Sequence, residues 1–156
     1  MFSYKTSREC EIGRGGTAYT EGHISIEDSR VTIAESEEDK DRWGDIWYRR
    51  NDRYTIHADN YTKLIGNLLG IGHTMADIEP EDQGVRGSYN SLRTEDAKKL
   101  FLLMICVLKN MESWSARGLV SRLCGDKVRY HTYIYTCDDF FPDCDSCNST
   151  REYWTN

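Results

Sequence analysis

Three cysteines close to the C-terminus have residue types and a spacing that could hold a metal ion. Cys144 and Cys147 are separated by two residues, and Cys137 precedes them by a short acidic stretch. A Cys-x2-Cys spacing lets two thiolates reach one tetrahedral zinc ion, and residues 138–143 could fold back to bring in Cys137 as a third ligand. Structural zinc held by Cys137, Cys144 and Cys147 is therefore the sharpest chemical hypothesis, with the fourth ligand unassigned.

The same cysteines have simpler interpretations that the sequence leaves open. In a reducing compartment they would be free thiols without any cofactor, and in an oxidising one they could form a disulfide. Asp143 and Asp145 flank Cys144 and oppose a reactive thiolate, which argues against redox catalysis. A nucleophilic pair of one of these tail cysteines with His73 or His131 would have to meet in space. We therefore expect any metal to hold the C-terminus rather than to perform chemistry.

A run of acidic side chains is the first candidate for binding a partner. We expect it at a connection between strands, where such charges are usually solvated. If it is functional, it would steer a partner with a basic surface, such as the nucleic-acid groove of another protein. Its members are Glu35, Glu37, Glu38, Asp39 and Asp41.

A patch of aromatic and arginine residues follows directly and is the second candidate. Trp, Tyr and Arg dominate the hot spots of protein interfaces, and they can equally stack on bases and contact phosphate. The structural alternative is cross-strand packing of the aromatic rings, with arginines covering their edges. The patch consists of Trp43, Trp47, Tyr48, Arg49, Arg50, Arg53 and Tyr54.

The first 58 residues, which contain both candidates, read as strands. Ile24 and Ile26 alternate with polar residues, and glycines at 13, 15 and 16 are typical of a hairpin turn. The pattern predicts an antiparallel sheet of three to five strands with one solvated face. The expected strands cover residues 2–12, 19–28, 31–34, 45–50 and 53–58.

Helices are expected over residues 59–125. The first follows a cap at Asp59 or Asn60 and ends at Gly70 or Gly72, and residues 73–90 read as a connection. Thr94 caps a buried central helix over 97–111, and a third helix over 113–124 stops at Gly125. We expect Cys106 and Cys124 in the core, and an alternating late strand over 127–137.

Composition limits the class of the protein. A chain of 156 residues fits one domain, and folding can bury roughly two-thirds of its surface. The formal net charge of −6 argues against general affinity for nucleic acid. The most apolar run, 100–108, is too short for a bilayer span of about 20 residues. Without a secretory signal at the N-terminus, we expect a cytoplasmic protein with no membrane contact.

The sequence therefore predicts a single α+β domain over residues 1–156. An antiparallel sheet is expected over 1–58, two or three helices packed mainly on one face over 59–125, and a late strand with the cysteine-rich tail over 126–156. Small size, acidic balance and aromatic strands favour a non-enzymatic inhibitor or adaptor of a larger complex, and a virus-encoded factor acting against a host defence would fit. One alternative is a small hydrolase or transferase whose His, carboxylate or Cys site assembles in space. The other is a nucleic-acid-binding domain with a zinc-stabilised tail.

Overall fold

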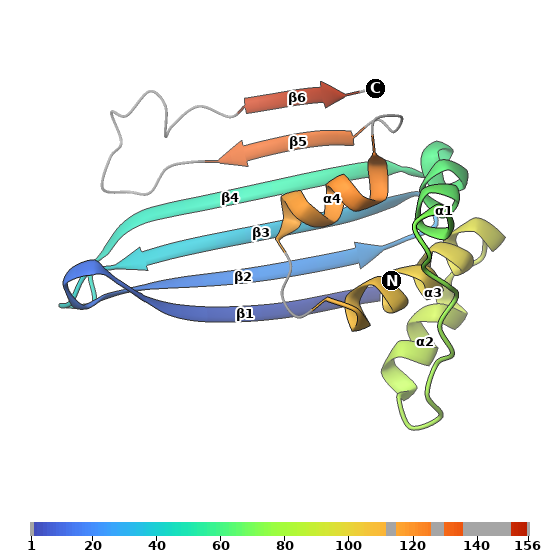
Figure 1. Cartoon of the computed structure of the whole chain (residues 1–156), viewed down its shortest axis with the longest axis horizontal. Coiled ribbons are helices and arrows are strands. Elements are labelled where there is room, and N and C mark those ends of the chain that lie inside the picture. Colours follow the sequence, from blue (N-terminus) through green and yellow to red (C-terminus); the bar gives the residue numbers. More distant parts are fainter. Residues whose placement is uncertain (1, 112–114, 126–129, 136–150, 156) are drawn as a thin grey trace.

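A single antiparallel sheet with helices gathered at one end is the architecture of the described part of the chain (Figure 1). The computed structural model describes residues 2–111, 115–125, 130–135 and 151–155. Within these ranges six strands follow each other across the sheet in chain order. They are β1 (Phe2–Ile12), β2 (Gly16–Ile26), β3 (Arg30–Lys40), β4 (Ile46–His57), β5 (Tyr130–Tyr135) and β6 (Arg151–Thr155).

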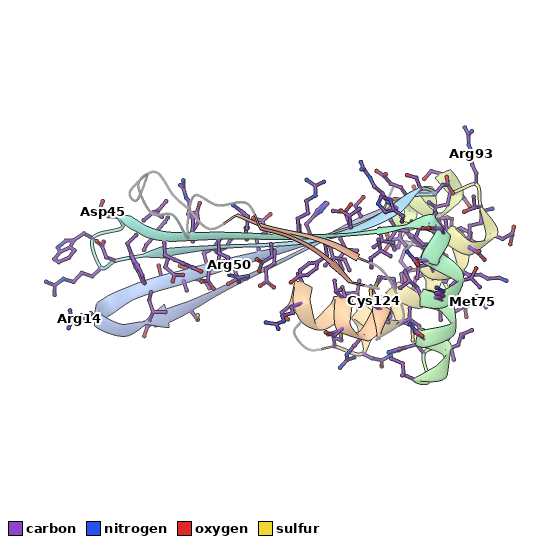
Figure 2. The ribbon with its side chains drawn as sticks, turned by 90° about the horizontal axis from the view of Figure 1, so that it is seen from above. Arg14, Asp45, Arg50, Met75, Arg93 and Cys124 are labelled. Carbon is purple, nitrogen blue, oxygen red and sulfur yellow. The ribbon has the colours of Figure 1, made fainter. Side chains whose placement is uncertain are left out.

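Four helices are described. They are α1 (Tyr61–Gly70), α2 (Gln83–Ser91), α3 (Glu95–Lys109) and α4 (Ala116–Cys124), together with short 3-10 turns at Gly13–Gly15 and Ala58–Asn60. The first three helices lie beyond one end of the long strands, and α4 lies against one face of the sheet (Figures 1 and 2). The opposite end of the sheet, formed by the β1–β2 and β3–β4 hairpins, projects away from the helices.

The alternation predicted from the sequence creates the face on which the helices pack. Side chains at every second position of a strand share a face, and the register aligns Ile24 with Ile33 and Ile33 with Tyr54. We call this the inner face, and its opposite the outer face. The helices bury Leu64 of α1 and Phe101 of α3 against it, so one continuous core joins the sheet and the helices.

Hydrogen bonds at the helix ends show why the helices begin where they do. The Thr94 hydroxyl accepts from the Ala97 N–H over 3.2 Å, which caps α3 as the sequence predicted. Asp28, in the turn between β2 and β3, accepts from the N–H groups of Arg93 and Thr94 over 2.8 and 2.9 Å. These bonds lower the pKa of Asp28 below its ordinary value. One carboxylate therefore ties the β2–β3 turn to the start of the central helix.

The α+β class, with a sheet and helices on one face, is confirmed, but three local predictions were wrong. Residues 45–50 and 53–58 belong to one strand, because residues 51 and 52 continue the ladder with β3 instead of turning. Residues 73–90 are not only a connection, since α2 begins after Asp82, whose carboxylate accepts from the Val85 N–H. The acidic run lies within β3 up to residue 39, not at a connection between strands.

The late strand is described only in part. The structure places β5 at Tyr130–Tyr135 beside β4, and the flanking residues 126–129 and 136–150 lie outside the described residues. Among the helices that the structure describes, none combines the length and apolarity needed to cross a bilayer.

Candidate interaction surface

Charge replaces apolar side chains where the inner face extends past the helices. Glu35 and Glu37 continue β3 on this face, and Arg50 and Asp52 face them from β4. The Arg50 guanidinium donates to Glu35 over 2.9 Å and to Asp52, and it lies 3.9 Å from the Glu37 carboxylate. One arginine therefore serves as the counter-charge of three carboxylates.

Glu35 connects this charged cluster to α4. Its Oε1 accepts from Arg50, and its Oε2 accepts from the Ala116 N–H over 3.1 Å, at the first turn of the helix. The N-terminal end of a helix carries a partial positive charge and free N–H groups, which a carboxylate satisfies. Ser115 supplies the ordinary cap by accepting from Gly118. The cluster therefore anchors α4 to β3 and β4, which is a structural role.

Burial controls the ionisation of the acids in this region. It raises the pKa of Glu37, and the negative charge of Asp39 raises it further, while Arg50 opposes both effects. Burial also raises the pKa of Asp39, which is 9% exposed. Burial alone would lower the pKa of Arg50, but the hydrogen bond and charge of Glu35 outweigh it and raise that pKa. Glu35, Glu37 and Asp39, three of the five residues of the predicted acidic run, therefore lie on the inner face of the sheet and are largely shielded from solvent.

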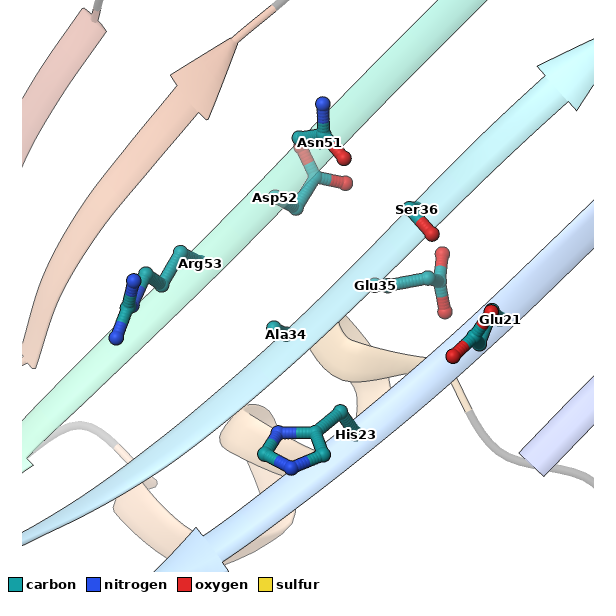
Figure 3. A pocket seen from close by; sticks show the side chains of 8 residues that line it. All are labelled: Glu21, His23, Ala34, Glu35, Ser36, Asn51, Asp52 and Arg53. Carbon is teal, nitrogen blue, oxygen red and sulfur yellow. The ribbon is translucent and has the colours of Figure 1, made fainter. Parts of the chain in front are cut away.

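The outer face carries a separate ion pair and a shallow hollow. Arg49 lies 3.2 Å from Glu38 across the β3–β4 ladder. Next to this pair, a hollow of about 380 Å³ lies over β2, β3 and β4 (Figure 3). Ala34 is small enough to leave room between His23 and Arg53, which align with it in the register. The hollow is open. Because His23 and carboxylate side chains line it, it is the surface that best fits the predicted alternative of a hydrolase or transferase site.

A larger groove than this hollow lies between the two hairpin ends, and we call it the tip groove. It has a volume of about 860 Å³. Ile12, Gly13, Arg14 and Gly16 line it from the β1–β2 side, and residues 39–43 and Trp47 line it from the β3–β4 side. Figure 2 shows Arg14 and Asp45 at these two ends, far from the helices.

Two tryptophans make the tip groove unusual for a solvated surface. Trp43 is 72% exposed and Trp47 is 48% exposed, although each carries one of the largest apolar side chains. The Arg42 guanidinium lies 4.2 Å from the centre of the Trp43 ring, which is a cation–π contact. An aromatic pair held beside arginines in a concave surface is a typical arrangement for binding a partner.

Defined turns hold the side chains of the tip groove. Asp41 Oδ1 accepts from the N–H groups of Trp43 and Asp45 over 2.9 and 3.0 Å, and Gly44 supplies the positive φ that this turn requires. On the other side, a Cβ added to Gly16 would lie 2.6 Å from the Lys40 carbonyl oxygen. The glycine therefore lets the two hairpins approach closely at the base of the tip groove.

The alternation of β4 divides the predicted aromatic and arginine patch. Trp47 and Trp43 reach the tip groove, whereas Tyr54 belongs to the core and Arg50 to the charged cluster. Arg49 and Arg53 lie on the outer face. The ring of Tyr48 lies 6.0 Å from that of Trp47. The structure thus brings only the two tryptophans of the predicted set together at one exposed surface.

Three charged residues of the tip groove were not predicted from the sequence. Arg14, Lys40 and Arg42 also line the tip groove. Their signal in the sequence was their position in or next to predicted turns, because antiparallel hairpins bring alternate turns to the same end of a sheet. Arg14 has a positive φ of 64°, which fits the tight turn but could not be predicted from its residue type.

The zinc hypothesis concerns residues outside the described part of the chain. Cys137, Cys144 and Cys147 all lie within residues 136–150. Among the described side chains, no group of three or more His, Cys, Asp or Glu residues is arranged to hold a metal ion. The zinc site therefore stays a prediction.

Comparisons with known proteins add no family to this description. No protein-family model, curated protein or solved structure matches the chain, so its function has to be argued from the tip groove and its surroundings.

Proposed function

We propose that this protein is a non-enzymatic interaction module that binds a partner protein through the tip groove, as an inhibitor or an adaptor of a larger complex. The observation that carries the proposal is the exposure of Trp43 and Trp47 beside the tip groove. Removing large aromatic side chains from water is favourable, so a partner surface that covers these rings would gain binding free energy. Truncating such residues at protein interfaces often costs about 2–4 kcal/mol of binding free energy.

The charges around the tip groove favour a protein over nucleic acid. Arg14, Lys40 and Arg42 supply positive charge, but Asp39 and Asp41 line the same groove. A nucleic-acid backbone is uniformly negative, so the Asp41 carboxylate, the more exposed of the two, would lie close to phosphate groups. A protein surface carries both signs and can complement both. The net charge of −6 adds a long-range preference for a partner with a basic surface.

The shape of the sheet explains how such a module could act. The hairpins place the tip groove at the far end from the helices, so a partner can reach it without touching the core (Figure 2). The charged cluster around Arg50 links β3, β4 and α4 at the base of this extension. A projecting tip of this kind can enter a cleft of a larger protein, and this is the geometry expected of an inhibitor.

Site-specific crosslinking in the native host tests the proposal. Trp43 would be replaced by p-benzoylphenylalanine, which keeps an aromatic ring and forms a covalent bond with a neighbouring protein under ultraviolet light. The control places the same group at Ile71, an exposed apolar position 59% accessible at the helical end. We expect a discrete crosslinked protein from position 43 that is missing from position 71. Equal crosslinking from both positions, or none from either, would count against the tip groove.

A nucleic-acid function predicts a different result at the same surface. Binding to single-stranded DNA would weaken steeply with salt and would require Arg14 and Arg42. Arg50 is unsuitable for this test, because its replacement would disturb the charged cluster rather than a contact surface. We expect no salt-dependent binding to single-stranded DNA at physiological ionic strength. Binding that is lost on replacing both Arg14 and Arg42 by Ala would favour the nucleic-acid alternative.

A further inference from the structure

A cysteine, a histidine and an asparagine meet at the helical end of the molecule, far from the tip groove. Cys106 lies in the last turn of α3, with Leu102 one turn earlier, and Asn110 is the cap residue that directly follows the helix. The segment after α1 runs along this stripe, because the Ala76 N–H donates to the Leu102 carbonyl over 3.2 Å. The same segment brings His73 Nδ1 to 3.7 Å from Cys106 Sγ.

The contacts around the sulfur supply both groups that a nucleophilic thiol needs. His73 Nδ1 is placed to accept the thiol proton in the tautomer with its proton on Nε2. The Asn110 side-chain amide lies 3.5 Å from Sγ and donates to the Cys106 carbonyl over 2.9 Å, which fixes its orientation. An amide N–H directed at sulfur stabilises negative charge on it. One neighbour therefore removes the proton and the other stabilises the thiolate.

Exposure and the neighbouring groups together distinguish Cys106 from the other cysteines that the structure describes. Cys124 is buried, and burial raises the pKa of its thiol to about 12, which makes it inert. Cys10 is exposed on β1, where Glu9 and Glu11 are its neighbours along the strand. Cys106, expected in the core, is only half-buried. It therefore combines access for a small reagent with a base and a hydrogen-bond donor.

We propose that Cys106 is a reactive thiol, activated by His73, that exchanges with small disulfides. The amide beside Sγ faces the sulfur itself, as thiol–disulfide exchange requires, whereas acyl transfer would need donors aimed at a carbonyl oxygen. The site lies on different elements from the tip groove and does not depend on the proposed function. It would make this end of the protein a site of reversible S-thiolation.

The reaction balances without any further reactant. The Cys106 thiol proton passes to His73 Nδ1, and Sγ attacks one sulfur of the small disulfide. A bond forms between Sγ and that sulfur while the S–S bond of the reagent breaks. The leaving thiolate takes the bonding electron pair and recovers the proton from His73. Cys106 is thus oxidised to a mixed disulfide, half of the reagent is reduced to a thiol, and a second free thiol reverses the modification.

The test measures the rate of mixed-disulfide formation at each cysteine of the full, reduced chain. The probe is 2-hydroxyethyl disulfide, which is uncharged and therefore insensitive to nearby acids, and acid quenching followed by peptide mass spectrometry assigns each rate. The same measurement on the urea-unfolded chain gives the rate of Cys106 without His73 beside it. We expect the folded chain to react at least about fivefold faster than the unfolded chain at Cys106, and much more slowly at Cys124.

Two variants separate activation from exposure. His73→Ala should reduce the folded rate of Cys106 below the unfolded rate, because the thiol keeps its partial burial but loses its base. If His73 only shielded the sulfur, the same variant would accelerate the reaction instead. Asn110→Ala should slow Cys106 by a smaller factor and leave Cys10 unchanged. A folded rate at Cys106 that does not exceed the unfolded rate in the unsubstituted protein would overturn the proposal even if either variant failed to fold.

Discussion

Replacing Arg50 by methionine tests whether the charged cluster holds the extended half of the sheet. The change keeps an apolar stem but removes the guanidinium shared by Glu35, Glu37 and Asp52. Removing one partner of a fully buried ion pair costs about 3–5 kcal/mol, whereas an exposed pair contributes about 0–1 kcal/mol. The side chains of Arg50 and Glu35 are 25% and 10% exposed, nearer the buried limit. We expect Arg50→Met to lower the free energy of unfolding by about 2–4 kcal/mol at pH 7.

The cost of Arg50→Met should depend on pH in a defined direction. Burial raises the pKa of Glu37 and of Asp39, and the positive charge of Arg50 lowers both, so its removal raises them further. An acid whose pKa is raised on folding stabilises the folded state below that pKa, and this stabilisation is lost as the pH rises through it. The cost should therefore be largest at pH 7 and smaller near about pH 5.

Urea unfolding followed by tryptophan fluorescence measures both effects, and the neighbouring Arg49 provides a matched control. Arg49→Met is the same substitution on the outer face, where the arginine and its partner Glu38 are 37% and 40% exposed. It should cost less than about 1 kcal/mol. Equal losses for the two variants would refute the structural role of the cluster. A loss for Arg50→Met that does not change between pH 7 and pH 5 would refute its electrostatic origin.

Three further predictions concern the turns and the tip groove. Asp28→Ala should lower the urea midpoint at pH 7, and the difference should shrink as the pH falls below about 4 and through the lowered folded pKa, because the acid stabilises the fold only while it is charged. Gly16→Ala should destabilise the fold by about 1–3 kcal/mol in thermal unfolding, since its Cβ would meet a β3 carbonyl oxygen, whereas Gly13→Ala meets no atom within 4 Å and should cost less. Trp43→Ala with Trp47→Ala should change the free energy of unfolding by less than about 1 kcal/mol, and a larger loss would mean that the rings support the fold.

The helices and the first hairpin could be predicted because local signals determine them. The Thr94 cap and the glycine after α4 act within one turn of the chain, and Gly125 adopts the positive φ expected of a helix stop. Helix α2 was not predicted because Gly84 and Gly87 lower its helix propensity. Its tertiary context outweighs this low propensity in the folded protein.

The long β3–β4 hairpin could not be predicted from strand propensity, because acidic residues are uncommon in strands. Its signal lay in charge pairing. The register pairs Glu37 with Arg50 and Glu38 with Arg49. The two members of each pair are equally far from the turn at Trp43 and Gly44. Opposite charges at matching distances from a turn support an antiparallel pair. Burial of the acidic run, by contrast, depends on how α4 docks, which strand patterns do not reveal.

The reactive thiol could not be found from spacing. His73 and Cys106 are far apart in the sequence, and neither lies in a recognisable motif. They meet because α1 ends at Gly70 and the following segment runs along α3. Sites assembled in this way depend on the packing of helices, and only the structure supplies it.

The most direct test of the interaction surface is the affinity of the crosslinked partner for two matched double variants, measured by isothermal titration calorimetry. One variant combines Trp43→Ala with Trp47→Ala, and the other combines Ile71→Ala with Met75→Ala, which removes two similarly exposed apolar side chains at the helical end. We expect the tryptophan variant to weaken binding at least about 30-fold, while the control stays within about twofold of the unsubstituted protein. Unchanged affinity for the tryptophan variant, or equal losses for both, would contradict it.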